Sequence, residues 1–321
     1  MDIPITLEVT ASGKKIIRYN ASAIKESECQ RRTYLTVAGG YTERLNNNDV
    51  EFGSAFHLFA SEMERTNGDS VKSLAAATKY YAEKPMIMKS NKTYLDKKFL
   101  QSVCMEWLTF AEGDRFKVLR DSNSQPIVEI KFAYPYYADD EVEVILCGTI
   151  DRVGKFDNGI YAFGDYKTTA VYKIEEYLKS YLMSPQMLFY RLIIRKYAAF
   201  GGIWEEVNKL PVGCFIDGLF HKAPPKTTGG TGIEIVRSDV MVFSDVQLAE
   251  FERLLDGNIH TLIRMVKAGK LPDRYGMLYG SCETKYGNCK YWNACTAPTD
   301  LGFQTVMKHS FIQRPYDPLN L

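Results

Sequence analysis

The sequence lacks an apolar run long enough to cross a membrane. Its richest apolar stretch, residues 181–194, is interrupted by Arg191, whereas a membrane-spanning helix needs about 20 consecutive apolar residues. The N-terminal residues also lack the basic segment followed by an apolar one that marks a secretory signal. We therefore expect a soluble protein that stays in the cytoplasm.

Net charge is almost absent as well. The 321 residues include 40 Lys and Arg against 39 Asp and Glu, which leaves a formal charge of +1. A chain with so weak an overall field cannot attract a polyanion from a distance. Any anionic partner must therefore be held by a local patch of basic residues.

Internal repeats, heptad series and low-complexity segments are also missing, and 45% hydrophobic residues exclude a disordered or collagen-like chain. No G-x-x-x-x-G-K-[ST] motif occurs, so the chain does not encode ATP-driven unwinding. A chain of this length can bury a core without disulfide bonds. Seven cysteines without a secretory signal indicate reduced thiols with metal-binding or core roles.

Hydrophobic periodicity divides the chain into helical and extended segments. Apolar residues at helical spacing predict helices at 22–38 (capped by Ser22), 51–66, 69–83, 94–112, 184–199 and 248–266. Runs rich in Val, Ile, Phe and Tyr predict strands at 126–137, 142–150, 159–168, 212–220 and 233–243. This order indicates an α/β or α+β layered fold with an N-terminal helical portion.

Two short motifs place charged residues in neighbouring predicted strands. Asp151 ends the strand 142–150, and Asp165 and Lys167 lie in the next strand. Because residues two apart in a strand face the same side, Asp165 and Lys167 point together, and Asp151 can project beside Asp165. Paired carboxylates bind a hard divalent cation, and a lysine beside them suits phosphodiester hydrolysis. The alternative is a strand with solvent-exposed charges, because short motifs recur by chance.

Three further polar residues occupy predicted helices. His57 lies on the helix 51–66, where it is either a core histidine or a ligand that would suit Mn²⁺ as well as Mg²⁺. Gln186 and Tyr190 are four residues apart and share one helix face, which could contact a phosphate or a base. Taken alone, this face is an ordinary, partly exposed one.

The order of these motifs is more specific than any one of them. G-x-x-x-H at 53–57, G-x-x-D at 148–151, G-D-Y-K at 164–167 and Q-x-x-x-Y at 186–190 resemble the motifs of RecB-type nucleases. The chain thus resembles the PD-(D/E)XK superfamily, in the branch of the RecB-family exonucleases. This resemblance implies a restriction-endonuclease-like α/β core, with a mixed central sheet flanked by helices.

The resemblance also implies roles for individual residues. It makes His57, Asp151 and Asp165 ligands of Mg²⁺ or Mn²⁺, joined by the backbone carbonyl of Tyr166. It makes Lys167 the catalytic lysine, acting with Asp151 and Asp165. Gln186 and Tyr190 would contact the substrate.

The cysteines extend the resemblance. Cys282, Cys289 and Cys295 form a group near the C-terminus, but a zinc site or a cubane iron–sulfur cluster takes four thiolates. Cys29 resembles the first cysteine of the iron–sulfur RecB-type nucleases, which include CRISPR-associated and AddB-type enzymes. The resemblance implies a [4Fe–4S] cluster on these four residues, a clasp that closes a loop of 253 residues (282 − 29).

The cluster motif departs from its branch in one respect, and its metal has an alternative. Six residues separate Cys282 from Cys289, where two are usual in that branch. Structural Zn²⁺ is the alternative, because four cysteines suit either metal. The remaining cysteines lie in apolar surroundings and are predicted core residues: Cys104, Cys147 and Cys214.

Basic residues near aromatic ones are candidates for contacts with a single strand, through backbone charge and base stacking. These candidates are Lys25, Arg31, Arg32, Lys222 and Lys226, with Tyr34 and Tyr172 as stacking partners. An ordinary solvated surface explains the same residues equally well.

The resemblance implies a metal-dependent DNA nuclease, a phosphodiester hydrolase that acts as an exonuclease on single strands or DNA ends. Two alternatives stay open: a non-catalytic DNA-end-binding or assembly subunit of a recombination or CRISPR-type complex, and an endonuclease of the same superfamily. The expected partners are DNA and recombination or CRISPR-associated proteins, in a bacterial, archaeal or phage-infected cell.

The predicted ligands also bear on domain organisation. Metal ligands from 57 to 165 and cluster ligands from 29 to 295 interlock along the chain. We therefore expect one elaborated nuclease domain over 1–321. It would have a helical portion at about 22–112, a catalytic sheet core at about 126–243, and a closing helix with the Cys clasp at about 245–296.

Overall fold

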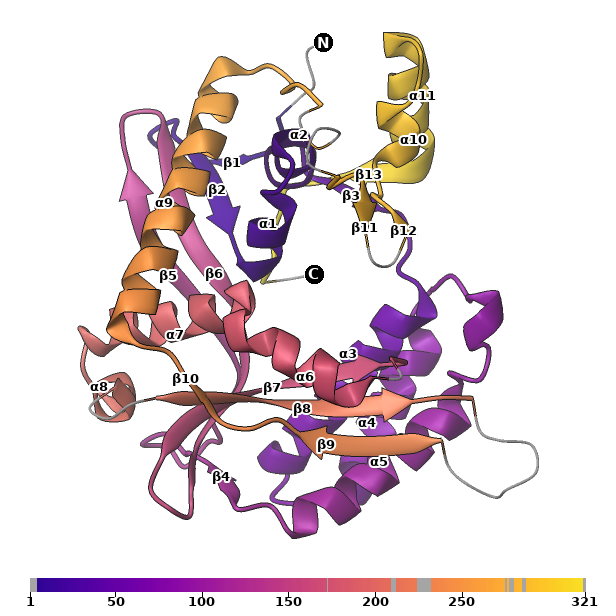
Figure 1. Cartoon of the computed structure of the whole chain (residues 1–321), viewed down its shortest axis with the longest axis vertical. Coiled ribbons are helices and arrows are strands. Elements are labelled where there is room, and N and C mark those ends of the chain that lie inside the picture. Colours follow the sequence, from indigo (N-terminus) through magenta and orange to yellow (C-terminus); the bar gives the residue numbers. More distant parts are fainter. Residues whose placement is uncertain are drawn as a thin grey trace. The chain divides into compact units, whose positions relative to one another are not determined.

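The computed structural model describes residues 5–171, 173–208, 212–223, 232–274, 276, 280–284 and 287–319 (Figure 1). The chain divides into two compact units. The first unit contains Met1–Arg44, Lys131–Gly148 and Asp245–Leu321, and the second contains Leu45–Ile130 and Thr149–Ser244. Two strands, β5 (Val128–Ala138) and β6 (Val142–Phe156), contribute residues to both.

The sheet of the second unit is mixed. β6 pairs antiparallel with β7 (Tyr161–Thr169), and β7 pairs parallel with β8 (Gly213–His221). The β6–β7 turn uses Gly159 at φ +89°, a backbone conformation that glycine adopts without steric cost. Every residue of β8 is buried, as expected for a strand covered on both faces. Shorter strands pair antiparallel with β6 or β8: β4 (Phe116–Val118), β9 (Ile233–Arg237) and β10 (Met241–Val242).

Helices cover both faces of this sheet (Figure 1). On one face, the ring of Tyr166 packs edge-on against Phe56 and Trp107. On the other face, Phe163 of the same strand packs against Tyr190. The helices are α3 (Asn48–Arg65), α4 (Ser70–Glu83), α5 (Lys97–Glu112), α6 (Ile174–Lys179), α7 (Pro185–Ala198) and α8 (Ile203–Asn208), with 3₁₀ turns at Ser90–Lys92 and Ser180–Met183.

The first unit is built on the outer parts of β5 and β6. β1 (Glu8–Val9) pairs antiparallel with β2 (Lys15–Tyr19), and β2 pairs parallel with β6. The long helix α9 (Asp245–Ala268) runs beside β5 (Figure 1), where Tyr136 donates a hydrogen bond to Asp256 over 3.4 Å. Its other elements are α1 (Ala21–Glu26), α2 (Gln30–Thr33), a π-helix (Tyr34–Ala38), β3 (Tyr41–Glu43), β11 (Glu283–Thr284), β12 (Gly287–Asn288), α10 (Trp292–Cys295), α11 (Asp300–Ser310) and β13 (Phe311–Gln313).

The expected mixed α/β architecture is confirmed, but some predicted boundaries are wrong. The helix predicted at 22–38 is broken because Cys29 has extended backbone angles, and Asn20 rather than Ser22 caps its first part. The strand predicted to end at Ile150 continues to Phe156, so Asp151 lies within β6. The strand predicted at 233–243 is two short strands. Among the described residues, no helix has the length and apolar character needed to span a bilayer.

His221 is a neutral imidazole in the core of the second unit. It is 4% exposed, its Nδ1 lies 3.0 Å from the Tyr94 hydroxyl, and its ring packs against Phe52 and Phe99. Burial, helped by the nearby charge of Lys92, lowers the pKa of His221 to about 4. The folded chain therefore binds fewer protons at this site than the unfolded chain, whose histidine pKa is about 6.5.

This difference predicts a loss of stability in mild acid. The stabilisation is complete above about pH 6.5 and is lost as pH falls toward 4, by up to about 3 kcal/mol in the free energy of unfolding. Urea denaturation at stepped pH measures it, and His221→Gln should lose this part of the pH dependence. His260→Gln, which changes a ring that is 46% exposed, should retain it. Identical pH profiles for wild type and His221→Gln would contradict the assignment.

Candidate metal centre

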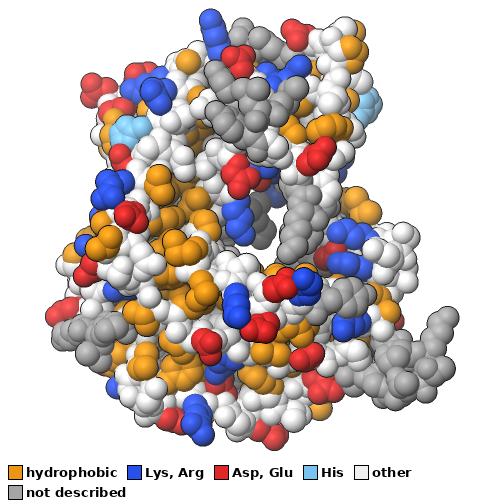
Figure 2. Space-filling view, viewed as in Figure 1, with side chains coloured by type: hydrophobic (Ala, Val, Ile, Leu, Met, Phe, Trp, Pro, Cys, Tyr) orange, Lys and Arg blue, Asp and Glu red, His pale blue; other side chains and the backbone are white. Residues whose placement is uncertain are grey.

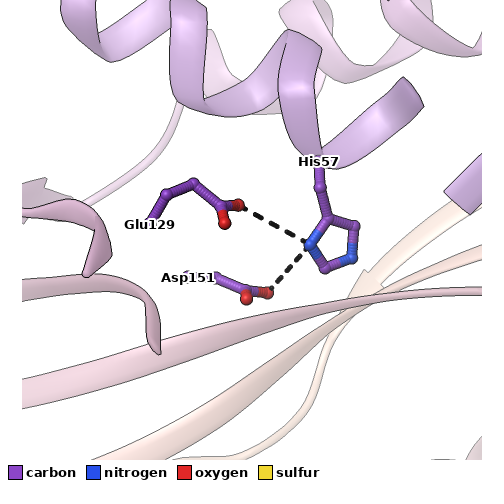
Figure 3. A group of neighbouring side chains, drawn as sticks. All are labelled: His57, Glu129 and Asp151. Atoms are coloured by element: carbon purple, nitrogen blue, oxygen red, sulfur yellow. Dashed lines mark ion pairs between the residues drawn. The ribbon is translucent and has the colours of Figure 1, made fainter. Parts of the chain in front are cut away.

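Three side chains from three elements meet in the second unit. His57 comes from α3, Glu129 from the start of β5 and Asp151 from β6 (Figure 3). The Nδ1 atom of His57 lies 3.4 Å from Asp151 Oδ2 and 3.8 Å from Glu129 Oε1. Ligand atoms of the three residues all lie within 4.8 Å of one another. One imidazole nitrogen with two carboxylates forms a donor set that suits a divalent cation.

The backbone of Tyr166 orients this group. Its carbonyl lies 3.1 Å from His57 Nε2, and its N–H donates to Asp151 Oδ2 over 2.8 Å. A hydrogen bond on one ring nitrogen fixes the histidine so that the other nitrogen faces the carboxylates. The Tyr166 carbonyl thus contacts Nε2 of His57, whereas Glu129 and Asp151 lie beside Nδ1. Its predicted role as a metal ligand stays a prediction.

The two charged residues of β7 lie together, as their spacing predicts. Arg152 of β6 pairs with Gly164 of β7, and the two strands are antiparallel. Asp151 and Asp165 are the neighbours of this pair, so they lie side by side on adjacent strands. The Lys167 ammonium forms an ion pair with Asp165 Oδ2. Both aspartates are buried. The strand pairing therefore brings the G-x-x-D and G-D-Y-K motifs to one place.

Gln186 and Tyr190 also reach this place, from α7. The Nε2 atom of Gln186 donates to Asp165 Oδ1 over 2.8 Å and to the Tyr190 hydroxyl over 3.1 Å. These bonds hold the Asp165 carboxylate in position. The predicted contact of Gln186 and Tyr190 with a substrate stays a prediction.

The local electrostatics reflect the crowding of carboxylates. Burial opposes the charged form of His57, but Asp151 and Glu129 outweigh burial and raise the pKa of His57 to about 10. Burial, together with the negative charge of Asp151, raises the pKa of Asp165 to about 6 although Lys167 opposes this. For Asp151, burial is outweighed by His57 and Lys167, so its pKa is lowered. Negative charge is thus concentrated where a cation would relieve it.

In this group, two buried carboxylate oxygens have a cationic side chain as their only partner among the described residues. Among the described residues, buried Oε1 of Glu129 and buried Oδ2 of Asp165 have no hydrogen-bond partner, apart from the ion pairs with His57 and Lys167. Buried carboxylate oxygens are normally hydrogen-bonded or coordinate a metal. The donor set and these oxygens therefore fit a hard divalent cation such as Mg²⁺ or Mn²⁺.

Glu129 is a member of this group that the sequence motifs do not indicate. It stands in the apolar segment 126–137, whose pattern predicts only a strand. An acidic residue between Val128 and Ile130 was the available signal. The structure adds a second one: Glu129 has φ +48°, in the left-handed region that L-residues avoid. Such strained residues gather at functional sites.

Replacement of Glu129 tests its place in this group. Glu129→Gln keeps the size of the side chain but removes one negative donor, so we expect the affinity for Mn²⁺ to fall about tenfold or more. Titration calorimetry with MnCl₂ measures this. Glu143→Gln, on the same hairpin but outside the group, is the matched control and should bind Mn²⁺ as wild type does. Unchanged affinity in Glu129→Gln would remove Glu129 from the ligand set.

The four cysteines line a second candidate site, in the first unit. Cys29, Cys282, Cys289 and Cys295 surround a pocket of about 90 Å³. The pKa values of Cys282 and Cys295 are raised, by burial first and then by the neighbouring thiols. Gly276 approaches so closely that a Cβ there would lie 2.9 Å from Cys29 Sγ. The structure thus places all four cysteines around one pocket.

The other cysteines are core residues, as predicted. Cys104, Cys147 and Cys214 are fully buried. Burial raises the pKa of both Cys147 and Cys214 to about 12, and raises that of Cys104 as well. These thiols are therefore protonated and inert at neutral pH.

Two of the residues predicted to contact a nucleic-acid strand are buried, so those predictions are wrong. Tyr34 is 0% exposed, so it cannot stack on a base, and Arg32 is 9% exposed and paired with Glu26. Lys226 and Tyr172 lie outside the described residues. Lys25 and Lys222 are exposed, and Arg31 is partly exposed and donates to the carbonyl of Pro272. Acidic and basic side chains are interspersed on the face shown in Figure 2, as the small net charge leads one to expect.

Comparisons with known proteins are sparse. No family model matches the sequence, and no curated protein matches it. Among solved structures, a protein from Eubacterium rectale with a provisional designation as an exonuclease matches over 80% of this chain and 84% of its own, at 14% identity and a TM-score of 0.44. The exonuclease LHK-Exo, solved with dAMP, matches over 72% of this chain and 98% of its own, at 10% identity and a TM-score of 0.28. At such scores the chemistry has to be argued from the site.

Proposed function

We propose that the chain is a divalent-metal-dependent nuclease that hydrolyses phosphodiester bonds of DNA as an exonuclease. One observation carries the proposal: the carboxylates of Glu129, Asp151 and Asp165 gather with His57 beside the Lys167 ammonium. A group that only binds DNA has no use for several buried carboxylates, which repel phosphate. The motif order supports assignment to the RecB branch of the PD-(D/E)XK superfamily.

Each residue has a distinct task in this proposal. His57, Glu129, Asp151 and Asp165 would hold Mg²⁺ or Mn²⁺, which when bound polarises the scissile phosphate and lowers the pKa of water. Lys167 places a positive charge beside the site, where it attracts the phosphate and stabilises charge that develops on its oxygens. Gln186 holds the Asp165 carboxylate through the hydrogen bond described above, and Tyr190 holds Gln186.

The substrate is tested by a digestion assay. Purified protein is incubated with end-labelled single-stranded DNA, duplex DNA, RNA and covalently closed circular DNA, each with MnCl₂ and with a chelator. We expect metal-dependent products from the linear DNA, and mononucleotides or short fragments released from its ends. Cleavage of the closed circle would identify an endonuclease. Binding without products in any metal would favour the non-catalytic alternative.

We also propose that the four cysteines hold a [4Fe–4S] cluster. The four thiols line one pocket, as the four thiolate ligands of a cubane cluster would. Zinc on the same four residues is the alternative. The cluster would join Cys29 to three cysteines more than 250 residues away and so stabilise the first unit.

A further inference from the structure

Two arginines and two aspartates form a closed group of ion pairs in the second unit. Asp217 of β8 pairs with both Arg152 of β6 and Arg237 of β9, and Asp114 pairs with Arg237. Arg152 also approaches Asp114, with 3.8 Å between Nη1 and Oδ2. Arg152 and Asp217 are both buried. Desolvation offsets much of the attraction in such a group, so stability alone does not explain it.

Arg152 joins this group of ion pairs to the back of the metal centre. Because neighbouring residues in a strand face opposite sides, Asp151 faces the metal centre and Arg152 faces the other side of the sheet. The guanidinium carbon of Arg152 lies 4.5 Å from the centre of the Tyr166 ring. The backbone of Tyr166 in turn contacts both His57 and Asp151. Arg152 therefore adjoins the metal centre by two routes, through the chain to Asp151 and through the ring of Tyr166.

The ring of Tyr166 is held on several sides. Phe56 and Trp107 pack edge-on against it, at 5.7 and 5.2 Å between ring centres. The Arg152 guanidinium, which also lies 5.7 Å from the centre of the Trp107 ring, completes this enclosure. Its removal would leave a space beside the Tyr166 ring, because a core is packed without spare room and refills a cavity only in part. The ring, and with it the backbone of Tyr166, would no longer be held from that side.

The glycine of the G-D-Y-K motif makes room for Arg152. Gly164 of β7 pairs with Arg152, and β7 lies between β6 and β8. The Arg152 side chain therefore has to cross Gly164 to reach Asp217 on β8. A Cβ at position 164 would lie 2.8 Å from Arg152 Nε and 2.6 Å from the Phe215 ring. A side chain at this position would thus displace the guanidinium.

We propose that Arg152 is a positioning residue of the metal centre, and that Gly164 provides the space that Arg152 needs. Arg152 holds the ring of Tyr166 and thereby the backbone N–H and carbonyl that orient Asp151 and His57. It acts through these residues, because its guanidinium lies on the side of the sheet opposite to the Asp151 carboxylate. The inference rests on the metal centre of the proposed function but not on the identity of the substrate.

Titration calorimetry of the whole protein with MnCl₂ tests the proposal. Arg152→Met keeps an unbranched side chain but removes the guanidinium. Because residues that orient metal ligands contribute about 10- to 100-fold to metal affinity, we expect Mn²⁺ to bind about tenfold or more weakly. Gly164→Ala should also weaken binding, since it displaces Arg152 without a change of charge. Arg152→Met combined with Asp217→Asn, which removes one acid with the lost cation, should bind Mn²⁺ as weakly as Arg152→Met alone.

Two controls separate positioning from stability. Arg237→Met removes the other cation of the group, whose guanidinium lies over the rings of Phe156 and Phe215 rather than that of Tyr166. This variant should have a lower thermal midpoint but bind Mn²⁺ as wild type does. Gly113→Ala adds a methyl group where nothing lies within 4 Å of a Cβ, so it should bind Mn²⁺ as wild type does as well.

The outcomes distinguish this inference from the proposed function. Wild-type Mn²⁺ affinity in a folded Arg152→Met protein, or an equal loss of affinity in Arg237→Met, would overturn the positioning role. If Arg152→Met alone does not fold, Gly164→Ala and the charge-balanced double variant decide in the same way. Absence of Mn²⁺ binding by the wild-type protein would refute the metal centre itself, and this inference with it.

Discussion

Lys167→Met and Asp165→Asn are each expected to reduce metal-dependent DNA cleavage by about 10²- to 10³-fold or to background. Lys167 is the cation beside the carboxylates, and removal of a preorganised charge from a reaction centre has effects of this size. Asp165 forms the ion pair that holds Lys167 and, in the proposed centre, would also contribute a ligand oxygen. The rate of product release from labelled single-stranded DNA in MnCl₂ measures the loss.

Folding has to be checked in the same experiment. Removal of one member of a buried ion pair leaves the other charge without its partner, which destabilises a protein. Circular dichroism and the thermal midpoint report this separately from activity. Lys173→Met and Asp140→Asn make the same chemical changes at exposed positions and should cleave as wild type does. Full activity in both Lys167→Met and Asp165→Asn would refute the assignment.

Cys29→Ser is expected to remove iron and sulfide from the protein and to destabilise the first unit. Cys29 is the only cysteine of the group that comes from the N-terminal part of the chain. Its loss would therefore remove the cross-link between that part and the segment that contains Cys282, Cys289 and Cys295. Loss of a structural metal group or long-range cross-link costs several kcal/mol. Iron and sulfide analysis and the visible absorbance of anaerobically purified protein measure the cluster. Cys214→Ser, in the core of the second unit, should retain the iron.

Gly276→Ala tests the same site without removing a thiol. The added Cβ would lie 2.9 Å from Cys29 Sγ and 2.8 Å from Ser281 Oγ, so we expect a lower iron content. Gly257→Ala is the matched control, because nothing lies within 4 Å of a Cβ there in α9. It should keep the iron and stabilise the helix by about 0.5–1 kcal/mol. A colourless protein that contains zinc, or unchanged iron in Cys29→Ser, would contradict the cluster.

The parts of the site that follow from strand and helix periodicity were predictable. Asp165 and Lys167 share a face because they are two residues apart in a strand, and Gln186 and Tyr190 share a face because they are four apart in a helix. The layered fold of helices and strands follows from the order of the helical and extended segments, whereas the mixed sheet was implied only by the resemblance to RecB-type nucleases. Asp151 lies beside Asp165 because β6 pairs with β7. This pairing joins strands that are consecutive in the chain and connected by a short turn at Gly159.

Features that depend on tertiary packing were not predictable. Glu129, the second residue of β5, lies beside His57 and Asp151 with a positive φ, which leaves no trace in hydrophobic periodicity. Arg32 and Tyr34 are candidates for contacts with a nucleic-acid strand in the sequence because basic residues there lie near an aromatic one. The structure buries Tyr34 in a π-helix that is buried along its whole length, and buries Arg32 in α2, where it pairs with Glu26. Charge in a sequence does not reveal which side of a short helix faces the core.

The position of a bound metal ion tests the central claim most directly. Crystals grown with MnCl₂ would be measured at a wavelength where manganese scatters anomalously. We predict an anomalous peak bonded to His57 and to the carboxylates of Asp151 and Asp165, with Glu129 in the same group. A protein saturated with Mn²⁺ that shows no peak at these residues would contradict the proposed centre.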